Sequence, residues 1–154
     1  GLAEVRTGLD DFEQTGAGIR LPYYLSLLAE GENHAGQPKK ALVTVDQALQ
    51  RANASGEKWH NADLFRLKAQ LLLHMKPSKS NDAEIAFQQA LKIARKQGCK
   101  ARELQTAIEL GQLWQSQGRQ REAHDLVAPI YGCFPNSSNS VYLKNAKSLL
   151  EELR

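Results

Sequence analysis

The side chains best suited to chemistry are scattered along this chain and form no catalytic motif. The sequence contains no His-Glu-x-x-His string, which would place two zinc ligands on one helix face, and no Gly-x-x-x-x-Gly-Lys-Ser/Thr phosphate loop. Adjacent acids such as Asp10 and Asp11 point to different sides of a helix, so we expect solvated surface rather than an acid/base pair. The histidines stand far apart, at His34, His60, His74 and His124. We therefore expect a protein that is not an enzyme and that uses no cofactor and no metal ion.

The cysteines and tryptophans are better explained by packing than by chemistry. Cys99 and Cys133 lack the spacing of zinc ligands, and two cysteines are too few for a disulfide scaffold. We expect both to be reduced, although the sequence leaves a disulfide between them open. Trp59 and Trp114 could each bind a ligand, but their positions favour a place in the core between helices. His74, near the end of an apolar stretch, is likewise expected to pack rather than to bind a metal.

Composition indicates a single globular domain. The 154 residues are 42% apolar and 24% charged, as in soluble proteins with a real core. The net charge of +3 is small and the aromatic residues are not interleaved with Lys and Arg, which argues against nucleic-acid binding. No apolar run approaches the roughly 18 residues of a membrane span, and no signal peptide is visible. We expect a cytoplasmic protein without membrane contact and, because its single methionine is Met75, a fragment of a longer polypeptide.

Three segments of the chain repeat one pattern of small and larger apolar residues. Ala41, Ala83 and Ala123 lie 42 and 40 residues apart. Each is followed four residues later by a larger apolar residue and three residues after that by another apolar one, in the pairs Val45 and Ala48, Phe87 and Ala90, and Val127 and Ile130. A fixed period of this length is typical of stacked helical repeats. Abundant Ala, Leu, Gln, Lys, Arg and Glu favour helix over strand, so the sequence predicts an all-α fold.

Prolines, glycines and a serine divide the chain into helical units. Pro22 and Pro38 suit the first turns of helices, Gly56 suits a helix end, and Ser140 can cap a final helix. We expect residues 1–18 to be the second helix of a truncated unit. Residues 19–56, 57–98 and 99–134 follow as repeats 1, 2 and 3, and residues 140–154 form a capping helix.

The third unit carries the features of a known repeat family. They are Leu110-Gly111, Trp114, Ala123, Val127 and Ile130. On these residues the chain resembles the tetratricopeptide repeat, in which small side chains such as Gly111 and Ala123 let two antiparallel helices approach closely. The resemblance implies a right-handed α-solenoid of antiparallel helix pairs, with about three repeats and a C-terminal capping helix. The first helix of the second unit can be registered in two ways, and the period near 40 exceeds the family's usual 34, which implies longer loops.

A narrower resemblance covers nearly the whole chain. It rests on the runs 21–25, 36–38, 56–64, 86–95 and 126–134. These runs are similar to the C-terminal region of large bacterial signalling ATPases. In those proteins a class III nucleotide cyclase or a DNA-binding domain precedes the ATPase module, and helical repeats follow. The resemblance implies a regulatory domain in signal transduction, acting as a sensor or scaffold, and it places no catalytic residue in this chain.

The resemblance also implies which side chains line a concave groove, because the first helix of each pair faces it. In the first and third units these side chains are Tyr23, Ser26, Glu30, Asn33, Gln105, Ile108, Gln112 and Gln115. The second unit adds Arg66 and Gln70 under one of its two registers. The groove is polar and nearly neutral. It lacks the Lys and Asn set with which chaperone-binding repeats hold a C-terminal carboxylate.

A second candidate surface is a basic rim. Stacking would bring the turns inside the helix pairs to one edge. The cations in these turns are Lys39, Lys40, Lys76, Lys79, Arg119 and Arg121. The rim could attract an acidic partner, or its charges could serve solubility alone, since Asp82 and Glu122 lie beside them.

Three functions remain open on the sequence alone. The first is an interaction module that binds a protein or peptide, including upstream domains of its own parent chain, through the groove or the rim. The second is a sensor that binds a small molecule and controls an attached ATPase or cyclase, which a deep pocket around Tyr23, Arg66 and Gln112 would favour. The third is a structural spacer, which an exposed apolar patch on the first helix would favour; that patch could also form a homodimer. Its residues are Leu2, Val5, Leu9 and Phe12.

Overall fold

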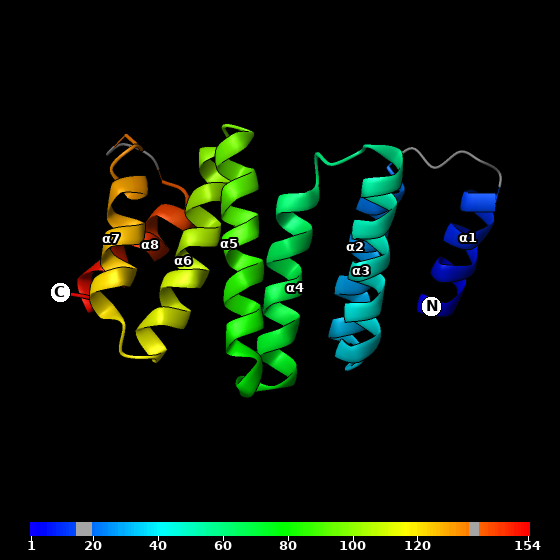
Figure 1. The fold of residues 1–154 in the computed structure, drawn as a ribbon, viewed down its shortest axis with the longest axis horizontal. Helices are drawn as coiled ribbons and strands as arrows, with labels where there is room; N and C mark the ends of the chain where they lie inside the picture. Colours follow the sequence, from blue (N-terminus) through cyan, green and yellow to red (C-terminus); the bar gives the residue numbers. More distant parts are fainter. Residues whose placement is uncertain (15–19, 136–138) are drawn as a thin grey trace. The chain divides into compact units, whose positions relative to one another are not determined.

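The computed structural model of the chain describes residues 1–14, 20–135 and 139–154, including all of their side chains except those of residues 12–14 and 77. Within these ranges the chain forms eight α-helices and one short 3-10 helix, with no strand. The prediction of an all-α fold is confirmed. The helices are α1 (Leu2–Gln14), α2 (Leu21–His34), α3 (Pro38–Ser55), α4 (Asn61–Met75), the 3-10 helix η1 (Pro77–Lys79), α5 (Ser80–Lys96), α6 (Lys100–Ser116), α7 (Gln120–Tyr131) and α8 (Val141–Glu152) (Figure 1).

Several helix ends lie at the prolines, glycines and serine that mark them in the sequence. Pro22 and Pro38 lie in the first turns of α2 and α3, where a missing backbone N–H costs no hydrogen bond. Gly56 follows α3 with a φ of 78°, a left-handed conformation that residues with a Cβ rarely adopt. The Oγ of Ser140 accepts a hydrogen bond of 3.2 Å from the backbone N–H of Tyr142 and so caps α8. These sequence predictions are confirmed.

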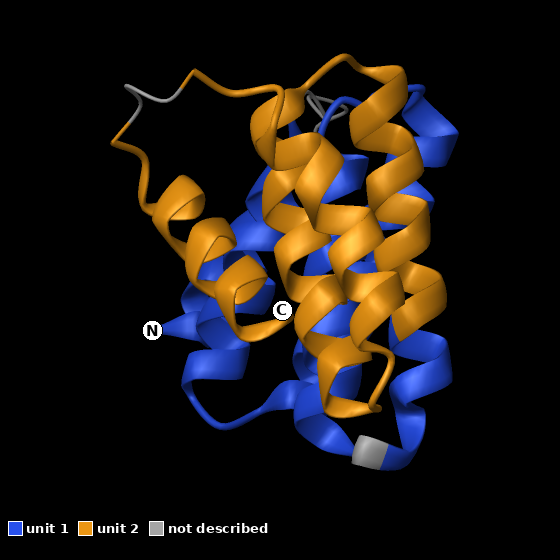
Figure 2. Ribbon diagram, turned by 90° about the vertical axis from the view of Figure 1, so that its left-hand side faces the viewer, with its two compact units in different colours: residues 1–83 blue, residues 84–154 orange. Residues whose placement is uncertain are grey.

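The described helices form two compact units, Gly1–Ala83 (unit 1) and Glu84–Arg154 (unit 2) (Figure 2). Unit 1 contains α1 to α4, η1 and the first residues of α5, and unit 2 contains the rest of α5 and α6 to α8. Each unit has a hydrophobic core of its own.

In unit 1, α2 and α3 run antiparallel across a short turn, and α4 packs against α3 (Figure 1). Ala41, Val45 and Ala48 of α3 are completely buried. Because two of these three side chains are a single methyl group, the helices facing them approach closely, and leucines of α2 and α4 fill the remaining space. The repeat spacing thus predicted the buried side of α3.

The first helix, α1, packs against the other helices of unit 1. Leu2 and Leu9 lie against the core of the unit, whereas Val5 is 49% exposed. The side chain of Phe12 and residues 15–18 of the predicted first segment lie outside the described residues. Of the apolar patch predicted for this helix, only Val5 among the described side chains is exposed.

A buried polar network joins α1, α2 and α3 in unit 1. Glu32 is completely buried. Its Oε2 accepts a hydrogen bond of 2.6 Å from Thr44 Oγ1, and its Oε1 lies 3.2 Å from Arg6 Nη2. Arg6 also donates to Thr44 and to Gln47. A carboxylate buried this completely needs partners, so the network fixes how α1 sits on α2 and α3.

In unit 2, α6 and α7 pack closely, and α8 lies against both. Gly111 lies at the closest approach: a Cβ on this glycine would come within 3.1 Å of Val127 and 3.9 Å of Ala123. The predicted role of Gly111 and Ala123 as the small contact residues between two helices is therefore confirmed. Leu149 of α8 also reaches this point, at 3.3 Å from the same Cβ position. At the other end of α8, Val141 is exposed.

Candidate functional site

In unit 1, two hydrogen bonds connect α2 with its neighbour α4. One is made to His60, the residue before α4, and the other to His74 within α4. Ser26 Oγ lies 3.0 Å from His60 Nε2, and Asn33 Oδ1 lies 3.2 Å from His74 Nδ1. The side of α2 that carries the predicted groove residues, spaced three or four apart, therefore lies next to α4. Gln70 and Arg66 precede His74 by about one and two helical turns, so these two predicted groove residues lie on the same side of α4. We refer to this surface as the α2–α4 face, and its predicted members are Tyr23, Ser26, Glu30, Asn33, Arg66 and Gln70.

Within this face, three side chains have the order of a hydrolase triad. Ser26 Oγ lies 3.0 Å from His60 Nε2, and His60 Nδ1 lies 3.3 Å from Asp63 Oδ2. In a triad, histidine accepts the serine proton. Here the Ser26 hydroxyl donates to the carbonyl of Tyr23 at 2.6 Å, so His60 is left to donate to the serine oxygen. Ser26 is also only 3% exposed. In this arrangement Ser26 and His60 brace α2 against the start of α4.

Aromatic rings gather at the end of the α2–α4 face where both helices begin. The ring of Tyr23 lies 5.6 Å from Tyr24, 5.9 Å from Trp59 and 5.2 Å from His60, measured between ring centroids. Tyr24 is 41% exposed and Trp59 is 44% exposed. The Arg20 guanidinium lies 5.9 Å from the Trp59 ring centroid. The expectation that Trp59 fills the core is wrong, because the residue precedes α4 and its ring lies against Tyr23 at the surface. We call Tyr23, Tyr24, Trp59 and His60 the aromatic cluster.

The other groove positions of unit 1 are polar. Glu30 is exposed, while Asn33, Arg66 and Gln70 are half-buried. Arg66 Nη2 lies 3.7 Å from Asp63 Oδ1. The face therefore continues away from the aromatic cluster as a strip of hydrogen-bonding side chains.

The groove positions of unit 2 are less available. Ile108 is buried in the core of the unit. Gln115 donates a hydrogen bond of 3.0 Å to Glu152 of α8. Gln112 is exposed and Gln105 is half-buried. Two of the four predicted residues are thus engaged inside the unit, because α8 packs on α6.

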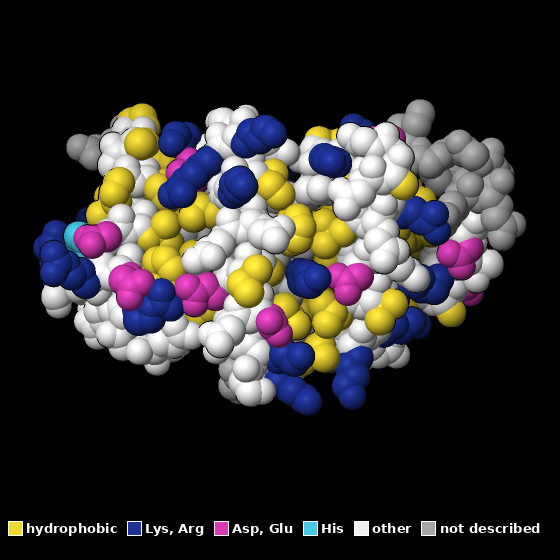
Figure 3. All heavy atoms as spheres, in the orientation of Figure 1, with side chains coloured by type: hydrophobic (Ala, Val, Ile, Leu, Met, Phe, Trp, Pro, Cys, Tyr) yellow, Lys and Arg dark blue, Asp and Glu magenta, His cyan; other side chains and the backbone are white. Residues whose placement is uncertain are grey.

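Four of the predicted rim residues belong to unit 1. The turn between α2 and α3 and the turn between α4 and α5 lie at the same end of the unit, and Lys and Arg side chains gather there at the lower edge of Figure 3. The residues at these turns are Lys39, Lys40, Lys76 and Lys79. All four are exposed, and Lys79 Nζ lies 3.8 Å from Asp82. This basic end is opposite the aromatic cluster along α2.

The two predicted rim residues of unit 2 differ from each other. Arg121 is exposed. Arg119 binds Glu84 at 2.9 Å and Glu122 at 2.7 Å, and its guanidinium lies 4.7 Å from the ring centroid of Trp114. Hydrogen bonds with Glu122 and Glu84 raise the pKa of Arg119 above its usual range, and the bond from Arg119 lowers the pKa of Glu122. The positive charge of Arg119 is therefore neutralised inside the unit.

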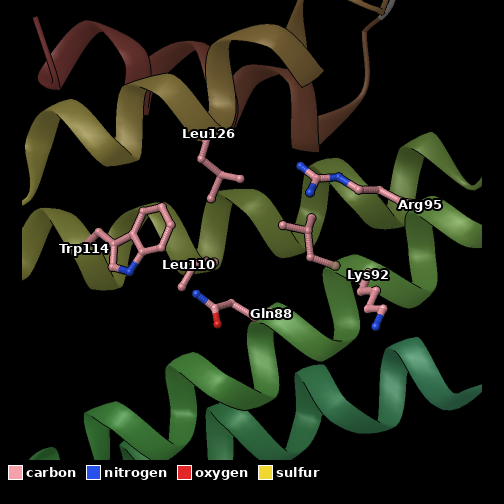
Figure 4. Close-up of a pocket in the computed structure, with 7 residues that line it drawn as sticks. Gln88, Lys92, Arg95, Leu110, Trp114 and Leu126 are labelled. Atoms are coloured by element: carbon pink, nitrogen blue, oxygen red, sulfur yellow. The ribbon is translucent and has the colours of Figure 1, made fainter.

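A cavity of about 330 Å³ opens between α5, α6 and α7 in unit 2 (Figure 4). Its walls are the apolar side chains Leu91, Leu110, Leu126 and Trp114 and the polar side chains Gln88, Lys92 and Arg95. None of the seven is a predicted groove or rim residue. The polar three follow each other at helical spacing along α5, but a polar stripe on a helix is usually only solvated.

Trp114 forms one wall of this cavity and, as expected, packs against the core of unit 2. Its Nε1–H is buried and has no hydrogen-bond acceptor within the described part of the chain. Figure 4 shows the nitrogen-bearing edge of the ring turned toward Gln88. A buried donor without a partner costs about 1–3 kcal/mol. This edge is therefore a place where an acceptor from a bound molecule would be stabilised.

Glu103 holds one of the cations of the cavity in place. Its Oε1 accepts from Arg95 Nε at 2.9 Å and its Oε2 from Lys100 Nζ at 3.0 Å, and the carboxylate is only 5% exposed. Burial acts to raise the pKa of Glu103, but the hydrogen bonds from Arg95 and Lys100 outweigh it, and the net pKa is lowered. Glu103 is bonded to the Nε of Arg95. The two terminal nitrogens of Arg95, on the cavity side of the guanidinium, make no bond to that carboxylate.

Among the described residues, no three His, Cys, Asp or Glu side chains are grouped so as to hold a metal ion. Within the same ranges, no helix combines the length and the apolar character needed to cross a membrane. Comparison with known protein families and with curated protein sequences finds no match to this chain.

Proposed function

We propose that the chain is a non-catalytic protein-binding module, built from tetratricopeptide-like helix pairs, that recognises a segment of another protein on the α2–α4 face of unit 1. The partner is a protein or peptide, from a separate chain or from the parent polypeptide. A regulatory role in the cytoplasm of a bacterium, as the sequence resemblance implies, is part of this proposal.

The observation that carries the proposal is the exposed aromatic cluster. Tyr24 and Trp59 each leave about two-fifths of the side chain in water, which amounts to roughly 100 Å² of ring surface apiece. At about 25 cal/mol per Å², covering one such ring contributes about 2.5 kcal/mol. Large aromatic side chains that combine this area with few rotatable bonds are the commonest anchors of protein interfaces. The braced position of Tyr23, His60 and Ser26 beneath them makes the cluster rigid before a partner arrives.

The rest of unit 1 supplies direction and charge. α2 has 14 residues, so the aromatic cluster and the lysines at the opposite end are separated by about 20 Å. Exposed Glu30 and half-buried Asn33 lie between them. The matching partner segment has an apolar or aromatic residue at one end and acidic residues about six extended positions away. Such a segment would place its apolar residue on the aromatic cluster and its acidic residues beside the lysines of the basic end.

Selection from a randomised peptide display library against the whole chain tests this function, with affinities of the selected peptides measured by calorimetry. We expect Trp59→Ala and Tyr24→Ala each to weaken binding about tenfold, a loss of about 1.4 kcal/mol. Val43→Ala, which truncates an even more exposed apolar side chain on α3, is the control and should leave affinity unchanged. Replacing Lys39 and Lys79 by Glu should weaken binding at low salt. Selected peptides whose affinity is insensitive to both aromatic substitutions would contradict the proposal.

A further inference from the structure

We propose that the cavity between α5, α6 and α7 binds a small carboxylate with an apolar body and a hydrogen-bond acceptor at its far end. The Arg95 guanidinium holds the carboxylate, Lys92 at the edge of the cavity adds positive charge, and Trp114 donates to the acceptor. The apolar body lies against the leucines of the cavity wall. This inference goes beyond the peptide recognition proposed for unit 1 and does not depend on it.

The charges of the lining select an anion. Gln88, Lys92 and Arg95 are its polar members, all three carry N–H donors, and no carboxylate belongs to the lining. The Lys92 ammonium has no hydrogen bond or ion pair among the described residues. Arg95 shares its Nε with Glu103, which leaves its two terminal nitrogens for another partner. Because Glu103 is shared between Arg95 and Lys100, it offsets the charge of Arg95 only in part, and the site keeps a net positive charge that favours an anion.

The apolar lining selects a ligand with a hydrocarbon body. Leu91 and Leu110 are buried at the floor of the cavity, and Leu126 is half-buried at its side. Leu126 and the ring of Trp114 are the half-buried apolar members of the lining. A bare inorganic anion would leave their exposed surface in contact with water, so this surface contributes to affinity only if the bound molecule covers it. Apolar side chains therefore separate the cationic end of the cavity from the indole of Trp114.

Trp114 provides the second polar contact. Its Nε1–H is buried without an acceptor within the described residues, and its ring is held by Arg119 at 4.7 Å, which is itself fixed by Glu84 and Glu122. A donor held this rigidly satisfies a ligand acceptor without losing conformational freedom. Figure 4 shows the nitrogen-bearing edge on the opposite side of the cavity from Arg95, so the acceptor and the carboxylate belong to opposite ends of the ligand.

The size of the cavity favours a small molecule over a peptide chain. A volume of about 330 Å³ is at the lower end of the range of small-molecule sites, which begins near about 300 Å³. A single aromatic ring with a short acid chain and one acceptor group is a molecule of this size. We therefore use 4-(4-acetylphenyl)butyrate as the probe, in which the acetyl oxygen is the acceptor.

The test compares this probe with three relatives on the whole chain by ligand-detected NMR. The relatives are 4-phenylbutyrate, which lacks the acceptor, 4-phenylbutanol, which lacks the charge, and inorganic phosphate, which lacks the apolar body. We expect the acetylated acid to bind saturably, 4-phenylbutyrate about threefold more weakly, and the alcohol and phosphate at least about tenfold more weakly. Lys92→Gln should weaken the acetylated acid about fivefold, whereas Lys96→Gln, at an exposed lysine of α5 outside the lining, should not.

Trp114→Phe separates the acceptor contact from packing. It keeps an aromatic ring but removes the N–H, so the acetylated and plain acids should bind this variant equally. The proposal is overturned by the absence of saturable binding up to about 10 mM, a concentration at which even weak small ligands are detected. Equal binding of the acid and the alcohol, or of the acid and phosphate, would also overturn it, as would equal effects of the two lysine substitutions. Peptide binding by Trp59 variants is measured separately. A negative result for the cavity of unit 2 therefore does not decide whether the α2–α4 face binds a peptide, and the reverse also holds.

Discussion

Substituting Arg6 by Met removes the cationic partner of a carboxylate that has no access to water. Glu32 is completely buried and lies 3.2 Å from Arg6 Nη2. After the substitution its remaining side-chain partner in the network is Thr44, which donates one hydrogen bond of 2.6 Å. One hydroxyl does not replace the hydration of a carboxylate. We therefore expect Arg6→Met to destabilise unit 1 far more than removal of a surface cation does.

The magnitude follows from the burial of the two partners. Removing one partner of a fully buried ion pair costs about 3–5 kcal/mol. The side chain of Arg6 is 25% exposed, so water partly reaches the vacated position and the lower end applies, about 3 kcal/mol. Adding Glu32→Gln to Arg6→Met removes the buried charge itself and should recover about 1–2 kcal/mol of that loss. Lys39→Met, at an exposed lysine, is the control and should change stability by less than about 0.5 kcal/mol.

Urea denaturation measures these differences, and the chain offers a reporter for each unit. Its two tryptophans are Trp59 in unit 1 and Trp114 in unit 2. In a Trp114→Phe background the fluorescence of Trp59 follows unit 1, and linear extrapolation gives the free energy of unfolding of each variant. A cost below about 1 kcal/mol for Arg6→Met, or no recovery on adding Glu32→Gln, would refute the argument that the carboxylate depends on its buried partner.

Two further predictions concern unit 2, read from Trp114 fluorescence in a Trp59→Phe background. Because the folded-state pKa of Glu103 is lowered, its carboxylate stabilises the unit above the pKa of the unfolded chain, and this stabilisation is lost as the pH falls through the folded-state value. Glu103→Gln should therefore flatten the fall in Tm between about pH 5 and pH 3, and parallel curves for the two proteins would refute this. Gly111→Val would force a branched side chain against Val127, 3.1 Å from the new Cβ, and should cost about 1–3 kcal/mol in urea denaturation. Gly8→Val, at an open position of α1 in unit 1, is the control and is read from Trp59 in a Trp114→Phe background; equal costs at the two glycines would show that packing is not the cause.

Local spacing was sufficient to predict the helices and much of their buried sides. Ala41, Val45 and Ala48 are completely buried because residues four and three apart share one side of a helix, whichever helix covers it. The small residue Gly111 was identifiable for the same reason, since a helix that must approach another closely needs a side chain without bulk at the contact. These inferences use distances of a few residues along the chain, where sequence and geometry are directly related.

The buried ion pair and the aromatic cluster required information that local spacing does not contain. Glu32 lies in a polar stretch of α2 and has the pattern of a surface residue, but its partner Arg6 is 26 positions away. Trp59 precedes α4, so no helical period determines its direction, and its ring is positioned by Tyr23, from a helix earlier in the chain. Both features depend on which helices become neighbours. A single sequence shows the apolar side of a helix more readily than the identity of the helix that covers it.

The cations of unit 2 show why charge in a sequence does not by itself identify a binding surface. Arg119 follows an exposed turn, where a free positive charge was expected, yet two carboxylates neutralise it and it holds the ring of Trp114. Lys92 lies inside a helix with nothing in its neighbourhood to single it out, yet its ammonium is unpaired among the described residues and the residue lies at the edge of a cavity. The charge available for recognition is therefore decided by which carboxylates the fold brings near each cation. By that criterion Arg119 is a positioning residue for the wall of the cavity, and Lys92 is the residue that can attract an anion into it.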